Sequence, residues 1–284
     1  MEHFYIITNE SKDSDFKITY RIRDYLLQCG KKCSIQKQGQ KKNGKGYTDI
    51  NCLSDDVDCV LVLGGDGTLL QAAVDLADLS VPFLGINLGT LGFLAEVNKN
   101  DIEQALSKLL KGEYEIENRM MLVGYYGKGT EENTRALNDI VITRKGTLQI
   151  ITFTISVNGQ FLHRYSADGM IVATPTGSTG YNLSAGGPVV DPKAQLMVIS
   201  PICPHSMQHN SIVLSPEDEI TIEIETGHDG IRQEVEAIFD GSHRVTLCTG
   251  DKIVIKRSEK TTGIVKLNKA SFLEILHRKM CDWK

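Results

Sequence analysis

The sequence lacks a long hydrophobic run, a signal peptide and a strong excess of charge of either sign. No apolar stretch approaches the roughly 20 residues that a helix needs to span a bilayer. The N-terminal residues have neither a basic region nor the long apolar core of a signal peptide. We therefore expect a cytoplasmic protein with no membrane partner.

Paired cysteines are also missing. The seven cysteines are odd in number, scattered, and include no CxxC pair, which is typical neither of a disulfide framework nor of a zinc site. His205 and His209 are four residues apart, but Pro204 and the lack of a third ligand argue against zinc. We assign no residue as a metal ligand.

The charge balance bears on possible partners. The 284 residues include 31 basic and 36 acidic side chains, which gives a formal net charge of −5. Non-specific nucleic-acid binding depends on cationic groups that face phosphates, so we expect no nucleic acid as a partner. The densest basic run, residues 31–45, favours a solvated loop over a ligand site.

Strand and helix signals alternate over the first part of the chain. The continuous apolar run Cys59–Leu63 is typical of a parallel strand that is covered on both faces. The alternation predicts βαβ units around a parallel, Rossmann-like sheet. The expected strands are 4–8, 33–36, 59–63 and 82–86, and the expected helices are 16–27, 69–79 and 101–110.

After Glu113 the pattern changes to short alternating segments, separated by turn residues such as Asn158-Gly159 and Asp240-Gly241. This predicts a mostly antiparallel β domain, and residues 270–280 predict a closing helix. The expected strands are 121–126, 139–143, 151–157, 161–165, 170–173, 212–214, 219–225, 233–239, 243–247 and 252–256. The predicted domains are an α/β domain at 1–115, a β-rich nucleotide-binding domain at 116–265, and a segment at 266–284 that packs back on the first domain.

One glycine-rich motif, Gly64-Gly65-Asp66-Gly67-Thr68, lies directly after the strongest strand and before a helix. Ligands of open parallel sheets bind at the carboxyl ends of strands, and the N-terminus of a helix offers free N–H groups to phosphate oxygens. Asp66 could accept a proton from a hydroxyl or help to hold a metal. The alternative interpretation is a turn with an aspartate that caps the helix.

A second motif follows a predicted strand, where residues 174–188 are rich in threonine, serine and glycine. Small hydroxyl side chains and free amides suit a phosphate or a ribose, and Tyr181 offers a flat face for stacking. An ordinary capped helix start would explain one or two of the hydroxyls but not the whole run.

The order and spacing of these motifs resemble those of the bacterial NAD kinases over nearly the whole chain. The motifs concerned are Gly64–Thr68, Asn87–Leu94, Leu137–Asp139, Thr174–Tyr181 and Gly186–Pro188. The resemblance implies an α/β domain, a β-rich domain, a site between them, and a homodimer or homotetramer.

The resemblance also implies roles for individual residues. Asp66 would be the general base, and Gly64, Gly65 and Thr68 would form a loop for the donor phosphates. The residues with implied NAD contacts are Gly67, Asn138, Asp139, Ser166, Asp168, Thr176, Thr179, Gly180, Tyr181, Asn182, Leu183, Ser184 and Ser242.

Four positions depart from the family pattern. Asp139 stands where the family usually has glutamate, and Gly180 where it usually has alanine. Ser166 and Ser242 replace residues that are often arginine and glutamine. The serine at position 166 leaves open how the substrate phosphates are neutralised.

Other interpretations explain less of the sequence. Residues 39–45 resemble the start of a P-loop, but Gly46 stands where a serine or threonine should bind magnesium. Lipid kinases and phosphofructokinases share the Gly-Gly-Asp-Gly turn but not the Thr174–Tyr181 motif. A non-catalytic NAD(P)-binding regulator should have lost the acid at position 66.

We therefore expect a kinase that transfers a phosphoryl group from ATP to the adenosine ribose 2′-hydroxyl of NAD, which makes NADP. A divalent metal, Mg²⁺, is the expected cofactor, because this reaction depends on positioning and charge neutralisation. Polyphosphate as an alternative donor and NADH as an alternative acceptor stay open.

Overall fold

The computed structural model describes residues 1–36, 48–89, 92–127, 132–146, 150–205, 209–227, 230–267 and 271–281. The P-loop-like residues 39–45 and most of the basic run lie outside this set. The chain divides into two compact units. Unit 1 contains Met1–Asn118 and Thr262–Lys284, and unit 2 contains Arg119–Thr261.

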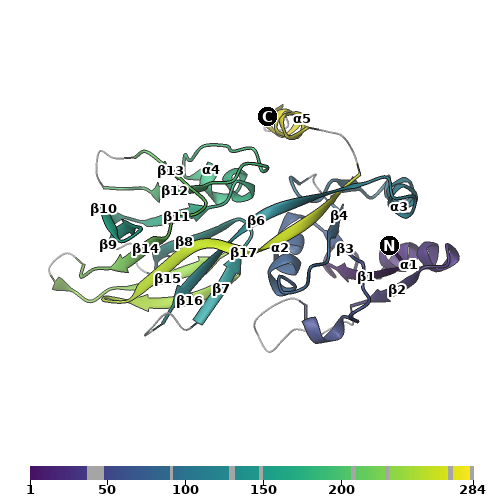
Figure 1. Ribbon diagram of the computed structural model, residues 1–284, viewed down its shortest axis with the longest axis horizontal. Coiled ribbons are helices and arrows are strands. Elements are labelled where there is room, and N and C mark those ends of the chain that lie inside the picture. The colour runs from purple at the N-terminus through teal and green to yellow at the C-terminus, as the bar shows by residue number, and fades with distance from the viewer. Residues whose placement is uncertain are drawn as a thin grey trace. The chain divides into compact units, whose positions relative to one another are not determined.

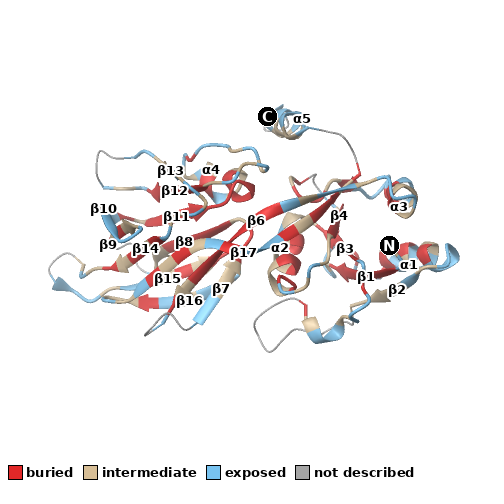
Figure 2. Cartoon of the chain, viewed as in Figure 1, coloured by how far each residue is buried: buried red, intermediate tan, exposed pale blue. Residues whose placement is uncertain are grey.

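Unit 1 is built on a parallel sheet in which β2, β1, β3 and β4 are neighbours in that order (Figure 1). Every residue of β1, β3 and β4 is buried (Figure 2), as the apolar runs of the sequence predict. The strands of this unit are β1 (His3–Thr8), β2 (Lys32–Ile35), β3 (Cys59–Gly64), β4 (Phe83–Asn87) and β5 (Val97–Asn98).

Two helices of unit 1, Lys17–Gln28 and Ile102–Leu110, pack apolar side chains such as Ile22, Leu26 and Leu106 into one core with the strands. The second helix begins at Asp66, three residues before its predicted start, because the extended Gly65 (φ −138°, ψ −174°) ends the strand segment directly before it. The helices are α1 (Lys17–Gln28), α2 (Asp66–Asp75), α3 (Ile102–Leu110) and α5 (Phe272–Cys281), with a short 3-10 helix η1 (Ile50–Cys52).

Unit 2 contains a six-stranded antiparallel sheet with the order β13-β12-β11-β8-β15-β16. Its strands are β8 (Asp139–Arg144), β11 (Gly169–Ala173), β12 (Met197–Ile202), β13 (Ile212–Leu214), β15 (Glu234–Phe239) and β16 (His243–Cys248). Residues 176–179 form the 3-10 helix η2 (Thr176–Thr179), and the short helix α4 (Tyr181–Ser184) follows it.

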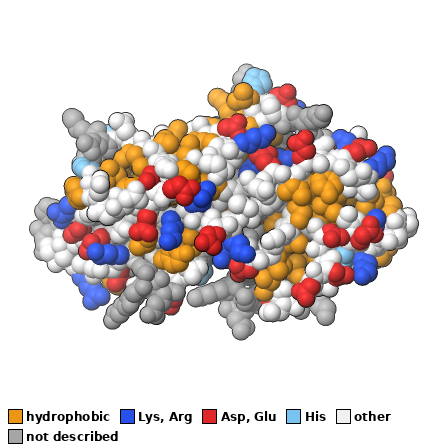
Figure 3. Space-filling view, viewed as in Figure 1, with side chains coloured by type: hydrophobic (Ala, Val, Ile, Leu, Met, Phe, Trp, Pro, Cys, Tyr) orange, Lys and Arg blue, Asp and Glu red, His pale blue; other side chains and the backbone are white. Residues whose placement is uncertain are grey.

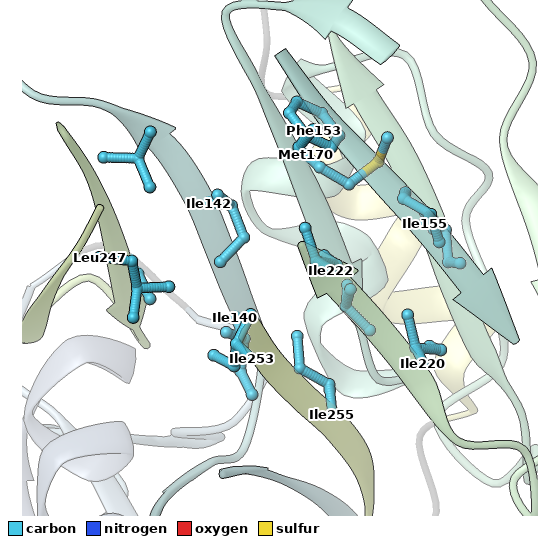
Figure 4. Close-up of a cluster of buried hydrophobic side chains, with 14 of the residues drawn as sticks. Ile140, Ile142, Phe153, Ile155, Met170, Ile220, Ile222, Leu247, Ile253 and Ile255 are labelled. Atoms are coloured by element: carbon cyan, nitrogen blue, oxygen red, sulfur yellow. The ribbon is translucent and has the colours of Figure 1, made fainter. Parts of the chain in front are cut away.

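A second group of strands in unit 2 faces this sheet across a shared apolar core. Figure 4 shows Ile140 and Ile142 of β8 and Met170 of β11 in this core, together with Phe153 and Ile222 from the second group. The second group comprises β6 (Glu115–Tyr126), β7 (Glu132–Ala136), β9 (Ile151–Val157), β10 (Gln160–Ala167), β14 (Ile220–Ile224) and β17 (Lys252–Lys266). The predicted fold class, an α/β part and a mostly antiparallel β part with a C-terminal helix, is confirmed.

Two strands are much longer than predicted. The predicted strands 121–126 and 252–256 are the ends of β6 and β17, which pair with each other and continue across the boundary between the units. The added residues of β17, such as Arg257–Thr262, are mostly polar and alternate poorly, so the sequence gives little strand signal there. The strands β7 and β12 were not predicted either.

The two predicted hairpin turns are confirmed by left-handed backbone angles at Asn158-Gly159 (φ 51° and 76°) and Asp240-Gly241 (φ 45° and 69°). Among the described residues, no helix is long and apolar enough to cross a membrane. On the face that Figure 3 shows, basic and acidic side chains are interspersed and do not gather by sign.

Candidate active site

The glycine-rich motif of unit 1 forms the junction between β3 and α2. A Cβ atom at Gly64 would overlap the side chain of Thr68, so the absence of a side chain lets the first turn of α2 pack against the end of the strand. Thr68 is itself buried, and its Oγ1 accepts a hydrogen bond from Nδ2 of Asn9 at 3.1 Å. The loop is therefore tied to the segment that follows β1.

Asp66 occupies the first turn of α2 and holds a distant segment of the chain. Its Oδ2 accepts the N–H of Phe93 at 2.7 Å, and its Oδ1 accepts those of Leu94 at 3.2 Å and Ala95 at 3.0 Å. Because backbone N–H groups only donate, all three suit an ionised carboxylate. A carboxylate has about four acceptor positions, so one is left for a substrate hydroxyl.

Gly92 explains how this segment approaches so closely. A Cβ atom at Gly92 would overlap the carboxylate of Asp66. The next residue, Phe93, packs against Phe272 of α5 with ring centroids 6.3 Å apart, and Nζ of Lys279 lies 5.0 Å from its ring centroid. The C-terminal helix thus contacts the residue whose N–H fixes the Asp66 carboxylate.

The strand ends bring further polar groups to the same edge of the sheet. Thr8 of β1 is aligned with Leu63 of β3, and Gly64 is aligned with Asn87 of β4, so the segments after these strands are neighbours. Lys12 lies in the segment after β1. Sequence reasoning missed Asn9 and Lys12, although their place after the first predicted strand was a usable signal.

In unit 2, Asp240 organises the turn that carries Asn138 and Asp139. Its Oδ2 accepts the N–H of Leu137 at 2.7 Å, and its Oδ1 accepts those of Asn138 at 2.7 Å and Asp139 at 3.1 Å. Oδ1 of Asn138 is buried and has no hydrogen-bond partner among the described residues. The turn therefore holds a buried acceptor that the described protein leaves without a donor.

The Asp139 carboxyl is the most strongly perturbed group of this turn. Burial and the negative charge of Asp240 raise the pKa of Asp139 to about 7. Burial also raises the pKa of Asp240 to about 6, although its three N–H donors act in the opposite direction. At neutral pH Asp139 retains a proton far more readily than an ordinary aspartate, so it can donate a hydrogen bond as well as accept one.

The hydroxyl-rich motif packs directly on the same turn. The N–H of Thr174 donates to the carbonyl of Asn138 at 2.8 Å, and its Oγ1 donates to the carbonyl of Leu137 at 2.6 Å. A Cβ atom at Gly177 would overlap the backbone of Asn138, and one at Gly180 would lie 3.8 Å from Oδ2 of Asp139. The structure thus brings the predicted residues 138–139 and 176–180 together.

The residues after this turn divide into a buried and an exposed set. Asn182 is fully buried; its Nδ2 donates to the carbonyls of Ser178 and Pro188, and its Oδ1 accepts the hydroxyl of Ser200 at 2.6 Å. These bonds occupy its side-chain amide with structural contacts. Tyr181 is 48% exposed, so its ring is accessible. Leu183 is partly buried, and Ser184 is exposed.

Asp168 lies away from this turn, and Ser166 lies two residues before Asp168, in β10, where it pairs with Thr152 of β9. The register pairs Gly169 with Thr143 and Ala173 with Asp139, so Asp168 is at the opposite end of the β8–β11 pair, about 17 Å along the strands from Asp139. Within the described chain, Asp168 does not join the cluster around Asn138. Nη1 of Arg144 lies 3.0 Å from Oδ1 of Asp168, and sequence reasoning missed this arginine.

Ser242 follows the turn at Asp240-Gly241, where its N–H donates to the carbonyl of Phe239 at 3.0 Å. It is therefore close in sequence to the carboxylate that holds the Asn138 turn. The hydrogen bonds that Ser242 makes in the described structure are to the carbonyl of Phe239 within the same turn.

Two family models match the chain. The ATP-NAD kinase N-terminal domain matches residues 4–114, and the ATP-NAD kinase C-terminal domain matches residues 137–267. The NAD kinases of Lachnospira eligens and Agathobacter rectalis are each 44% identical, over 99% and 100% of this chain and 100% of each relative.

The chain belongs to the NAD kinase family. This membership confirms the resemblance seen in the sequence and the prediction that the chain is a kinase. Among solved structures, the yeast NADH kinase complexed with NADH has a TM-score of 0.85 at 24% identity, and it covers 99% of this chain and 88% of that one. An NAD kinase from Archaeoglobus fulgidus in complex with ATP has a TM-score of 0.74 at 26% identity, with 94% of each chain covered.

The predicted divalent metal can be tested against the side chains of this family member. Among the described residues, no three His, Cys, Asp or Glu side chains lie close enough to hold a metal ion. Three of the roughly four acceptor positions of Asp66 are taken by N–H groups. The residues therefore do not fit a metal held mainly by the protein, and a divalent ion is better placed on the donor phosphates as part of that substrate.

Proposed function

We propose that the chain transfers the terminal phosphoryl group of ATP, or of a related donor, to the adenosine ribose 2′-hydroxyl of NAD, which makes NADP. The observation that carries this proposal is the carboxylate of Asp66, held by the N–H groups of residues 93–95 at the carboxyl ends of parallel strands. Ligands of parallel sheets bind at these ends.

Asp66 acts as the general base of the reaction. The ribose hydroxyl gives its proton to the carboxylate, its oxygen forms a bond to the terminal phosphorus, and the bond from that phosphorus to the leaving diphosphate breaks. A carboxylate within ~2.6–3.2 Å of the hydroxyl accelerates such a step by about 10²–10⁴. Gly64, Gly65 and Thr68 form the backbone of the loop that receives the donor phosphates.

Residues of unit 2 bind NAD. The buried, unpartnered Oδ1 of Asn138 and the perturbed carboxyl of Asp139 support polar contacts, and the exposed ring of Tyr181 supports stacking. Asn182 supports this surface indirectly, because its buried side chain donates hydrogen bonds to the carbonyls of Ser178 and Pro188. The other proposed NAD-binding residues are Gly67, Ser166, Asp168, Thr176, Thr179, Gly180, Leu183, Ser184 and Ser242.

Further features rest on the family resemblance. We propose ATP as the donor, in line with the archaeal family structure in complex with ATP, with Mg²⁺ carried on its phosphates and polyphosphate as an alternative. A homodimer or homotetramer, a cytoplasmic location, and domains at 1–115, 116–265 and 266–284 complete the proposal.

The test of the function is formation of NADP from NAD, ATP and Mg²⁺ by the purified chain. Asp66→Asn should lower kcat by about 10²–10⁴ while NAD still binds in calorimetry. Asp15→Asn is a matched control, because Asp15 is exposed and pairs only with Lys17 in the described structure. A folded D66N enzyme with nearly the wild-type kcat would contradict the role of Asp66.

A further inference from the structure

Lys12 is a cation held over the glycine-rich loop. Its backbone N–H donates to the carbonyl of Asn9 at 2.9 Å, and the N–H of Asn9 donates to the carbonyl of Leu63 at 2.8 Å. Nδ2 of Asn9 also donates to Oγ1 of Thr68. The segment that carries Lys12 is thus fixed to both the end of β3 and the start of α2.

The ammonium group lies close to two glycines from different strand ends. Nζ of Lys12 is 3.0 Å from the point that a Cβ atom of Gly65 would occupy, and 3.3 Å from the corresponding point at Gly89. The Nζ atom therefore lies near the backbones that follow both β3 and β4. A side chain at either glycine would crowd it.

Within the part of the chain that the structure describes, no acidic side chain neutralises the charge of Lys12. Lys12 makes no ion pair or side-chain hydrogen bond with any residue in the described ranges, whereas Lys17 nearby pairs with Asp15 at 3.2 Å. The carboxylate of Asp66 is taken up by three backbone N–H groups. A lysine beside the N-terminus of the ten-residue helix α2 adds positive charge to the positive end of the helix dipole. This arrangement of positive charge favours the binding of an anion near the N-terminus of α2.

We propose that Lys12 binds the phosphate chain of the donor nucleotide. This rests on the proposed function, in which the donor phosphates enter at the Gly64–Thr68 loop. An ammonium group is a compact charge that suits a flexible triphosphate. A diphosphate is also present in NAD, so the test separates the two substrates.

The first experiment measures steady-state kinetics of Lys12→Ala with Lys17→Ala as the matched control. Loss of a charge-assisted contact to phosphate should raise the KM for ATP by about 10-fold to 100-fold. The KM for NAD should change by less than about 2-fold. Lys12→Arg should recover part of the ATP affinity, which a purely structural role would not predict.

The second experiment measures binding without turnover. ADP should bind the Lys12→Ala protein about 10-fold or more weakly than the wild type, whereas AMP, which lacks the diphosphate, should bind both equally.

Two outcomes would overturn the proposal. One is unchanged ATP and ADP affinity in Lys12→Ala, and the other is a rise in the KM for NAD alone, which would place Lys12 on the other substrate. Failure of the proposed function is distinguishable, because the wild type itself would then make no NADP. The comparison of ADP with AMP tests Lys12 in either case.

Discussion

The replacement Gly92→Ala tests how Asp66 is held. Gly92 does not have a left-handed backbone, so alanine creates no backbone strain there. The new Cβ atom would instead overlap the carboxylate of Asp66. Either the carboxylate or the segment 92–95 must move, and the hydrogen bonds from Phe93, Leu94 and Ala95 to Asp66 cannot all survive.

The magnitude follows from the number of bonds at risk. Each hydrogen bond to a charged group contributes about 1.5–3 kcal/mol, and about 1.4 kcal/mol corresponds to a tenfold change in rate. If one bond to Asp66 is lost and the base is displaced accordingly, kcat should fall by about 10-fold to 100-fold. The free energy of unfolding should fall by about 1–3 kcal/mol.

The assay combines NADP formation, urea unfolding and amide hydrogen exchange at Phe93. The amide of Phe93 should exchange faster in Gly92→Ala, because its acceptor has moved. Gly67→Ala is the control for stability, since a Cβ atom there meets nothing within 4 Å. A Gly92→Ala protein with wild-type kcat and wild-type protection of Phe93 would refute the reasoning.

Two further predictions concern unit 2. Because burial and Asp240 raise the pKa of Asp139 to about 7, the folded state binds an extra proton between about pH 4 and pH 7, and this contribution to stability is lost as the pH rises through 7. Asp139→Asn should therefore gain stability relative to wild type from pH 5 to pH 8, on the order of 2 kcal/mol in urea unfolding; a constant difference would contradict the raised pKa. Asn182→Ala should lower the free energy of unfolding by about 2–4 kcal/mol, since the buried groups that it pairs lose their partner, whereas the exposed Ser184→Ala should change it by less than about 0.5 kcal/mol.

The sequence predicted the parts of the site that depend on neighbours in the chain. The strand Cys59–Leu63, the glycine turn and the following helix lie within a short stretch, so their pattern could be read directly. The hydroxyl-rich run after β11 was found for the same reason. Local patterns were sufficient for these features.

Contacts between distant residues could not be predicted in this way. Asp66 and Phe93 are 27 residues apart, and Asp240 and Asn138 are 102 residues apart. The local sequence around Asp240 indicates only a hairpin turn. Its structural role is to accept the N–H groups of residues 137–139, which lie about 100 residues earlier in the chain. Asp168 lies at the end of the β8–β11 pair that is opposite to Asp139. This placement depends on the antiparallel register of the two strands, which the sequence does not specify.

The candidate sites of the two units share one hydrogen-bonding arrangement. In each, one aspartate accepts N–H groups from three consecutive residues of a distant segment: 93–95 for Asp66 and 137–139 for Asp240. The neighbours of each aspartate determine what it can do. Asp66 lies among glycines and makes no ion pair with any described residue, and Nζ of Lys12 lies close to the neighbouring Gly65. Burial, together with the negative charge of Asp240, raises the pKa of Asp139 to about 7, so Asp240 holds the Asn138 turn in shape beside a carboxyl that binds a proton readily, whereas proton transfer is the role that we propose for Asp66.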